Sequence, residues 1–291
     1  MLAAALAMAL TTTCAPQFVA GVPGENHVMF RGLSPNGRTL AVGWDRDSGA
    51  SVQRGAYLLD LRSGTRTDLL HLNNAPSFSP DGRHLVSANY AADRSLKTEL
   101  VELDLRSGAA RTLASSSSAE WLGSYSADGR WILFNSTRTG ASDLYRIRRA
   151  DGRTKRLTDD PRYEAHAQFF DHDRKLIFHR QVAGDDYDIV IRDLRNRTEH
   201  AVGSTPAEEG YPAMSPDGRW IAFSTVTRSG QQPNLFVMRA DGSGRRQLTD
   251  GPAKDAYATW SRDGRSIVFV RFEPGGSKIL RLAVRNGTCV N

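Results

Sequence analysis

The sequence predicts an all-β protein, a six-bladed β-propeller with four antiparallel strands in each blade. Three observations support this fold: a five-residue turn that repeats along most of the chain, a second turn with the same period, and short apolar runs between them. A chain of 291 residues is long enough to hold six such units and to bury a sizeable core. With 40% hydrophobic and 24% charged residues, its composition excludes a multispan membrane protein and a collagen.

The first repeat is a five-residue turn, which we call the pentad. Proline at its second position presets φ, aspartate or asparagine bonds nearby amides, and glycine adopts the positive φ that closes a tight hairpin. Successive copies start 44 to 47 residues apart, a period typical of propeller blades. The six copies are Ser34–Arg38 (SPNGR), Ser79–Arg83 (SPDGR), Ser126–Arg130 (SADGR), Asp171–Lys175 (a degenerate DHDRK), Ser215–Arg219 (SPDGR) and Ser261–Arg265 (SRDGR).

The segments between pentads predict the other strands of each blade. A β-rich apolar run follows the pentad, as in Trp220–Phe223 (WIAF), and a third strand follows a polar loop, as in Leu235–Met238 (LFVM). A second turn then recurs, as at Asp241-Gly242, and leads into a polar outer strand such as Arg245–Thr249. Each unit is therefore expected to hold four strands that become less apolar from the inside to the outside.

The two ends of the chain predict how the ring closes. Only four residues follow the last turn at Asn286-Gly287, too few for a full outer strand, whereas Gln17–Val22 precedes the first blade without a partner in it. We expect the N-terminal segment to complete the last blade and cover its open edge. The expected division is a leader at residues 1–14, a ring-closing segment at 15–23 and the propeller at 24–291.

One stretch of the chain carries a family resemblance. Residues 215–250 (SPDGRWIAFSTVTRSGQQPNLFVMRADGSGRRQLTD) resemble the repeat of TolB-type six-bladed propellers, of the PD40 or WD40-like class, and the pentads extend the resemblance over residues 24–291. The resemblance implies a protein-binding propeller of the bacterial cell envelope. TolB proteins also carry an N-terminal α/β domain, which we do not expect in the short segment before the first blade.

The N-terminus indicates export. Residues 1–13 (MLAAALAMALTTT) form an uncharged, largely apolar stretch that is too short to span a bilayer and resembles the core of a secretory signal. Cys14 follows it and resembles a bacterial lipoprotein site, so it is the lipidation candidate. The alternatives are an unmodified cysteine or a disulfide with Cys289, because the two chain ends meet in a closed propeller.

The candidate binding site lies where the innermost strand of each blade begins, an end of the central channel that we call the channel mouth. Acidic residues stand upstream of several pentads, although the chain as a whole has a net charge of +6. This pattern predicts an acidic funnel that attracts cations or basic peptide segments, and ordinary loop polarity is the alternative. The expected partner-binding residues are Glu120, Glu164, His166, Glu209 and Asp255.

Motifs for catalysis are scarce. The chain has no GxSxG nucleophile elbow, no Walker A sequence and no GxGxxG sequence. A metal-dependent lyase or hydrolase acting on a carbohydrate in the channel is the alternative function, with His27 and His166 as the histidines near the expected mouth. We expect no catalytic residue, no metal and no cofactor.

These observations together predict a noncatalytic, monomeric propeller that binds a protein or peptide at the channel mouth. The expected location is the periplasm or outside the cell, with membrane contact only through a lipid anchor on Cys14. Nucleic acid is not an expected partner, because the excess of positive charge is spread along the chain as single arginines instead of forming a basic run.

Overall fold

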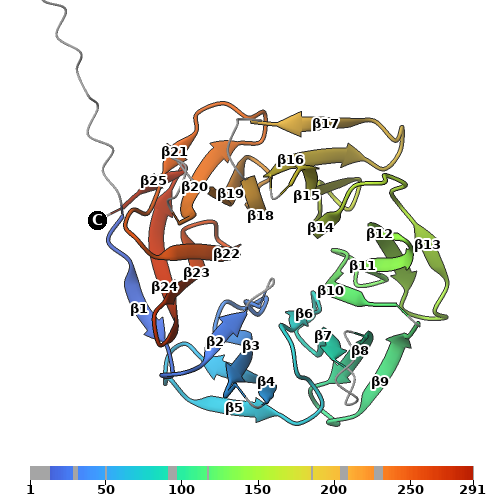
Figure 1. Ribbon diagram of the computed structural model, residues 1–291, viewed down its shortest axis with the longest axis horizontal. Helices are drawn as coiled ribbons and strands as arrows, with labels where there is room; N and C mark the ends of the chain where they lie inside the picture. The colour runs from blue at the N-terminus through green and yellow to red at the C-terminus, as the bar shows by residue number, and fades with distance from the viewer. Residues whose placement is uncertain are drawn as a thin grey trace, which may run out of the picture.

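The computed structural model is a closed ring of six antiparallel sheets around a central channel, five with four strands and one with five (Figure 1). It describes residues 14–28, 32–49, 51–90, 97–116, 118–184, 186–203, 209–225 and 232–290. The predicted all-β six-bladed propeller is confirmed. In the part of the chain described, no helix is long and apolar enough to cross a membrane.

Blades 1 to 5 run in chain order from the channel outwards, and blade 6 does so up to β24, outside which both β1 (Gln17–Ala20) and β25 lie. Blade 1 contains β2 (Asn26–Val28), β3 (Thr39–Asp47), β4 (Val52–Asp60) and β5 (Arg66–Leu69), and blade 2 contains β6 (Ser77–Phe78), β7 (His84–Tyr90), β8 (Thr98–Asp104) and β9 (Ala110–Ala114). Blade 3 contains β10 (Glu120–Tyr125), β11 (Trp131–Thr139), β12 (Ala141–Arg148) and β13 (Thr154–Arg156), and blade 4 contains β14 (Glu164–Phe170), β15 (Lys175–Ala183), β16 (Asp186–Asp193) and β17 (Glu199–Val202). Blade 5 contains β18 (Glu209–Met214), β19 (Trp220–Thr225), β20 (Asn234–Arg239) and β21 (Arg246–Gln247), and blade 6 contains β22 (Lys254–Trp260), β23 (Ser266–Glu273), β24 (Gly276–Arg285) and β25 (Thr288–Cys289).

The pentads form the hairpins between the first and second strands, as their residues predict. In the five copies that begin with serine, the serine Oγ donates to the Asp or Asn Oδ1 at 2.6–2.7 Å, and the amide after the arginine donates to the same Oγ at 2.9 Å. Their glycines adopt φ between 66° and 70°. The side chains of the pentad therefore satisfy the polar groups of their own turn.

Blade 4 makes its hairpin without serine or glycine. Asp171, His172 and Asp173 all adopt left-handed backbone conformations, with φ of 52°, 55° and 60°. Both carboxylate oxygens of Asp173 accept the amide of Ala127 in blade 3, at 2.8 and 2.9 Å. Ala127 can donate this bond because its pentad lacks the proline that three other copies carry.

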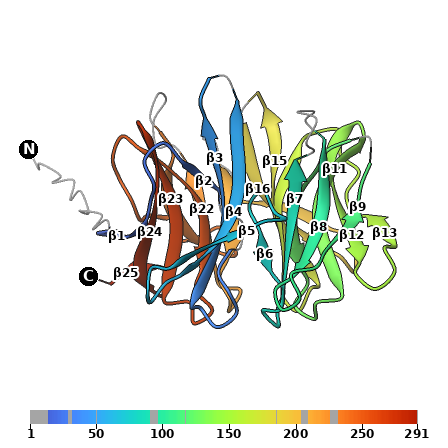
Figure 2. The same ribbon diagram turned by 90° about the horizontal axis from the view of Figure 1, so that it is seen from below.

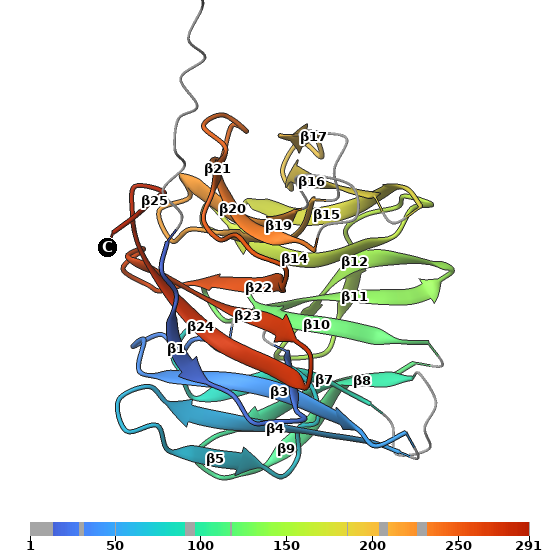
Figure 3. The same ribbon diagram turned by 60° about the vertical axis from the view of Figure 1, so that its left-hand side comes forward.

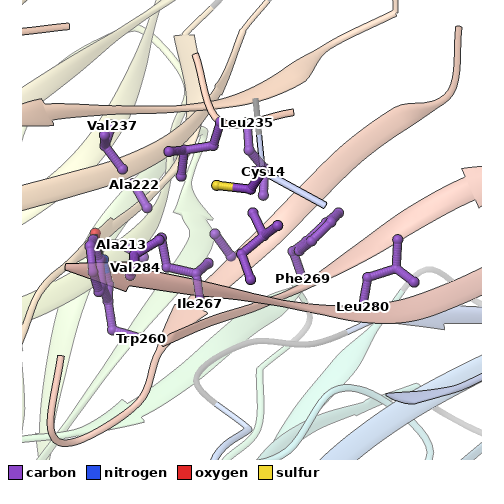
Figure 4. Packing of buried hydrophobic residues seen from close by; sticks show 13 residues of the cluster. Cys14, Ala213, Ala222, Leu235, Val237, Trp260, Ile267, Phe269, Leu280 and Val284 are labelled. Carbon is purple, nitrogen blue, oxygen red and sulfur yellow. Dashed lines mark hydrogen bonds between the residues drawn. The ribbon is translucent and has the colours of Figure 1, made fainter. Parts of the chain in front are cut away.

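The core lies between neighbouring blades. One apolar cluster joins blade 2 to blade 3 through Val86, Leu100, Ile132 and Phe134. Another joins blades 5 and 6, and Figure 4 shows Cys14 inside it, beside Leu235 and Phe269. The buried strands thus bind each sheet to the next one around the ring.

The N-terminal segment closes the ring, as expected. Strand β1 (Gln17–Ala20) pairs antiparallel with β24, on the edge that the two-residue β25 also uses (Figure 3). Cys14 donates its amide to the Leu248 carbonyl at 2.8 Å. The last blade is therefore completed from both ends of the chain.

Cys14 forms a disulfide with Cys289, which was the alternative pairing. A sulfur atom that is bonded to another sulfur has no thiol left for a thioether to lipid. Lipid attachment at Cys14 therefore does not fit this structure, and we correct that expectation.

Candidate functional site

The channel mouth is built from the first residues of the innermost strands of blades 3 to 6. Figure 2 shows the blades edge on, so that the strands run between the two ends of the ring. Glu120, Glu164 and Glu209 are the first residues of β10, β14 and β18, and Asp255 is the second residue of β22. The structure thus brings the predicted acidic residues to equivalent places.

These four carboxylates are fully buried and each pairs with an arginine of its own blade. Asp255 accepts two hydrogen bonds from Arg271, both at 2.7 Å, which is a bidentate pair. The other three pairs join Glu120 to Arg138, Glu164 to Arg180 and Glu209 to Arg245.

The expectation of an acidic funnel therefore needs correction. A carboxylate that is covered and neutralised by a guanidinium cannot contact a partner or attract one strongly. The geometry assigns Glu120, Glu164, Glu209 and Asp255 to positioning the innermost strands. Of the predicted residues, only His166 is partly exposed towards the channel.

Each acidic residue is followed two positions later by a residue with a left-handed backbone. The residues are Leu122, His166, Tyr211 and Tyr257, with φ between 55° and 57°. At this point in all four strands the register with the second strand shifts. Such bulges re-aim side chains, and strained backbone of this kind is common at functional sites.

Three of these side chains meet one another in the channel. The ring centroids of His166 and Tyr211 lie 4.6 Å apart, and those of Tyr211 and Tyr257 lie 4.8 Å apart. His179, from β15, lies behind them, with its Nε2 3.1 Å from Nδ1 of His166, and its ring stacks on Tyr187. We call Tyr163, His166, His179, Tyr187, Tyr211 and Tyr257 the aromatic cluster.

Burial keeps the imidazoles of the cluster neutral. Desolvation lowers the pKa of His179 to about 3 and holds the pKa of His166 well below its usual value, with a smaller effect from His179. Burial also raises the pKa of Tyr163 to about 12. Lys254 brings a positive charge to the edge of the cluster, with its Nζ 5.5 Å from the centre of the Tyr211 ring.

Burial acts on one carboxylate below the cluster as well. It raises the pKa of Glu164 to about 7, although Arg180 acts in the opposite direction.

The sequence interpretation missed most of this cluster. Tyr211 and Tyr257 follow Glu209 and Asp255 by two residues, as His166 follows Glu164, so the shared register was a usable signal. The contact between His179 and His166 depends on the pairing of β14 with β15, which the sequence alone does not show. His27 lies near the mouth, as expected, because it is the second residue of β2, but it is fully buried at the seam between blades 1 and 6, where its Nδ1 lies 2.9 Å from the Ser277 Oγ.

The other end of the channel holds a cavity of about 740 Å³. It is lined by all six pentads, with Pro35, Pro80 and Pro216 among its walls. Cavity and aromatic cluster lie at opposite ends of the innermost strands. The serine and aspartate side chains around the cavity are largely committed to their own turns, so the aromatic cluster offers the more specific set of contacts.

A family model described as the TolB beta propeller domain matches residues 14–189 and 181–291. The chain belongs to this family. Its TolB-like fold recurs in the crystal structure of TolB from Acinetobacter baumannii, with 24% identity and a TM-score of 0.67, over 81% of this chain and 57% of that one.

Two further proteins are similar to this chain, one over part of its length and the other in its fold alone. An uncharacterized protein of Agrobacterium fabrum, Atu1656, is 33% identical over 145 residues, which cover 48% of this chain and 45% of that protein, so less than half of that relative is matched. An oligogalacturonate lyase solved in complex with manganese shares the fold alone, with 12% identity and a TM-score of 0.59, over 94% of this chain and 97% of that one.

The part of the chain that the structure describes does not supply a full set of metal ligands. Among the described residues, no group of three or more His, Cys, Asp or Glu side chains could hold a metal ion. His166 and His179 provide two nitrogen atoms, and the nearby carboxylate of Glu164 is bound to Arg180. A catalytic zinc or manganese site would need at least one more protein ligand.

Proposed function

We propose that this chain is a noncatalytic propeller of the bacterial cell envelope that binds a protein or peptide at the channel mouth. The observation that carries the proposal is the aromatic cluster, because three of its rings are held on strained bulges and remain partly exposed. Tyrosine supplies apolar area, a hydroxyl group and little conformational freedom, and it is enriched at binding hot spots.

The buried ion pairs support this role because they hold the strands that carry the aromatic rings. Each pair joins the start of an innermost strand to an arginine of the same blade, next to the bulge that presents the ring. The rings are therefore held in place before a ligand arrives, which lowers the entropic cost of binding. Among the predicted residues, His166 contacts the partner directly in this proposal, and the carboxylates position the site.

The proposed location outside the cytoplasm rests on two features. The signal-like stretch precedes Cys14, and the Cys14–Cys289 disulfide requires an oxidising compartment to persist. The chain would act there as a soluble monomer.

Selection of peptides from a random displayed library by the full chain tests the proposal. The selected peptides should lose about tenfold or more in affinity with Tyr211→Ala or Tyr257→Ala, measured by calorimetry on variants with unchanged melting curves. His172→Ala, at the exposed rim of the opposite end, is the control and should leave affinity unchanged. Failure to select any peptide, or loss of affinity only with His172→Ala, would contradict a binding site at the mouth.

A further inference from the structure

The excess positive charge of the chain lies at one end of the ring. Every second turn is hydrogen-bonded to the pentad of its own blade, since the carbonyl of the last pentad arginine, or of Arg174 in blade 4, accepts an amide from the second turn at 2.8–2.9 Å. We call these twelve turns the pentad face. They are residues 34–38, 79–83, 126–130, 171–175, 215–219 and 261–265, with 60–65, 104–109, 148–153, 193–198, 239–244 and 283–288.

The pentad face contains 17 lysines and arginines against 11 aspartates and glutamates. This difference equals the whole net charge of +6, so the rest of the chain is formally neutral. Single arginines that look scattered along the sequence are therefore gathered by the fold onto one side of the molecule.

Most acidic groups of this face are hydrogen-bonded within their turns, whereas several of its basic groups are not. The aspartates accept hydrogen bonds within their own turns, as Asp81 does from Ser79 and the Arg83 amide. Several guanidinium groups project into solvent instead. Arg38, Arg83 and Arg219 are exposed, and among the described residues none of their side chains has a hydrogen bond or an ion pair.

The ring brings the turns that carry these cations together at one end of the molecule. Each blade supplies an equivalent basic residue at the end of its pentad, and the six blades stand side by side around one axis (Figures 1 and 2). A broad, flat ring of cations is complementary to an extended anionic surface, whereas a basic groove or a protruding helix would suit a nucleic acid duplex.

We propose that the pentad face docks the propeller onto a bilayer surface that carries anionic phospholipid headgroups. Attraction of several lysines and arginines to such a surface is additive and reversible, and it is weakened by salt. Docked in this way, the ring would lie flat with the channel mouth and its aromatic cluster facing away from the membrane. Membrane contact then needs no lipid on Cys14.

Sedimentation of the full chain with vesicles tests the proposal. Phosphatidylcholine vesicles containing one quarter phosphatidylglycerol should carry the chain down at low ionic strength, whereas phosphatidylcholine alone should not, and added salt should release it. The combined variant Arg38→Gln, Arg83→Gln and Arg219→Gln should weaken binding by about tenfold or more.

The matched control removes the same charge from elsewhere. Arg46→Gln, Arg54→Gln and Lys278→Gln change three exposed cations on β3, β4 and β24, and should weaken binding far less than the pentad-face variant. Melting curves must show that both variants fold. Equal losses in both variants, no binding to phosphatidylglycerol, or retention by duplex DNA in place of vesicles would overturn the proposal.

Discussion

The two ends of the ring differ in what holds them together. At the pentad face, almost every blade repeats one exposed turn whose polar groups bond one another locally. At the channel mouth, four blades bury a carboxylate against an arginine and then present different side chains on a bulge.

This difference indicates that the pentad turns build the frame of the propeller, whereas the channel mouth carries the side chains that can recognise a partner. The repeated turn builds the same hairpin in five of the six blades, and the mouth varies from Leu122 to His166 and Tyr211 at one structural position. Variation on a constant frame is how a symmetric fold makes an asymmetric binding site.

Opening the ring should affect both ends and give the largest loss of stability. Replacing Cys14 and Cys289 by serine removes a link between residues 275 positions apart, and we expect a cost of about 4 kcal/mol. Chemical denaturation of the variant, and of the native chain with reductant, should give the same lowered midpoint. A midpoint that does not move in either experiment would show that β1 pairing alone closes the ring.

The loss of one carboxylate should destabilise the fold more at the channel mouth than at the pentad face. Asp255→Ala leaves Arg271 partly buried without its partner and should cost about 3 kcal/mol, whereas Asp263→Ala in the exposed pentad of the same blade should cost about 1 kcal/mol. Urea unfolding of both variants measures the contrast. Equal costs would mean that the buried pair contributes no more than a surface turn.

The two ends should also respond to different pH ranges. The pKa values of His166 and His179 are lowered on folding, so below about pH 6.5 these two residues take up protons first in the unfolded chain and their contribution to stability falls, whereas Glu164, whose pKa is raised on folding, acts in the opposite direction. His179 alone should cost about 2 kcal/mol between pH 7 and pH 5. In the pentads, hydrogen bonds from serines lower the pKa values of Asp81 and Asp263, so their contribution is lost only in stronger acid.

Thermal melting as a function of pH checks this contrast. Replacing His166 and His179 by phenylalanine should flatten the decline between pH 7 and pH 5, and His172→Phe is the control because its side chain is exposed. A decline that persists without the two buried histidines would assign the acid sensitivity to another part of the molecule.

The smallest expected loss of stability concerns the two pentads that depart from the common pattern, in blades 3 and 4. Ala127→Pro restores the common pattern in blade 3 but removes the amide that Asp173 accepts, so it should destabilise the chain by about 1 kcal/mol. In an Asp173→Ala background the same change should cost much less. A stabilising effect of Ala127→Pro in the native chain would show that the proline outweighs the contact between blades.

Much of the frame could be predicted because its determinants are local. The pentad bonds depend on residues within five positions of one another, and closure by the N-terminal segment follows from a count of strands at the two ends. The spacing of the pentads is therefore enough to predict all six blades, including blade 4, where DHDRK replaces the usual turn.

The site was harder to predict because its determinants are not local. The positions of Glu164 and Glu209 were predicted correctly, but their burial depends on Arg180, 16 residues away, and on Arg245, 36 residues away. The aromatic cluster combines residues of three blades, and a repeat pattern identifies equivalent positions without showing which rings touch. The position of the arginines on one face likewise could not be predicted from the sequence, because the fold brings together residues that are far apart along the chain.

Photo-crosslinking at the two ends of blade 5 tests the central claim, that partners bind at the channel mouth. A benzophenone amino acid in place of Tyr211 lies at the mouth, and one in place of Pro216 lies at the opposite end of the channel, in the turn that follows β18. We predict that the probe at position 211 captures a discrete polypeptide from envelope extract, that excess unlabelled chain competes for it, and that the probe at position 216 does not capture it. Capture at position 216 alone would contradict this account.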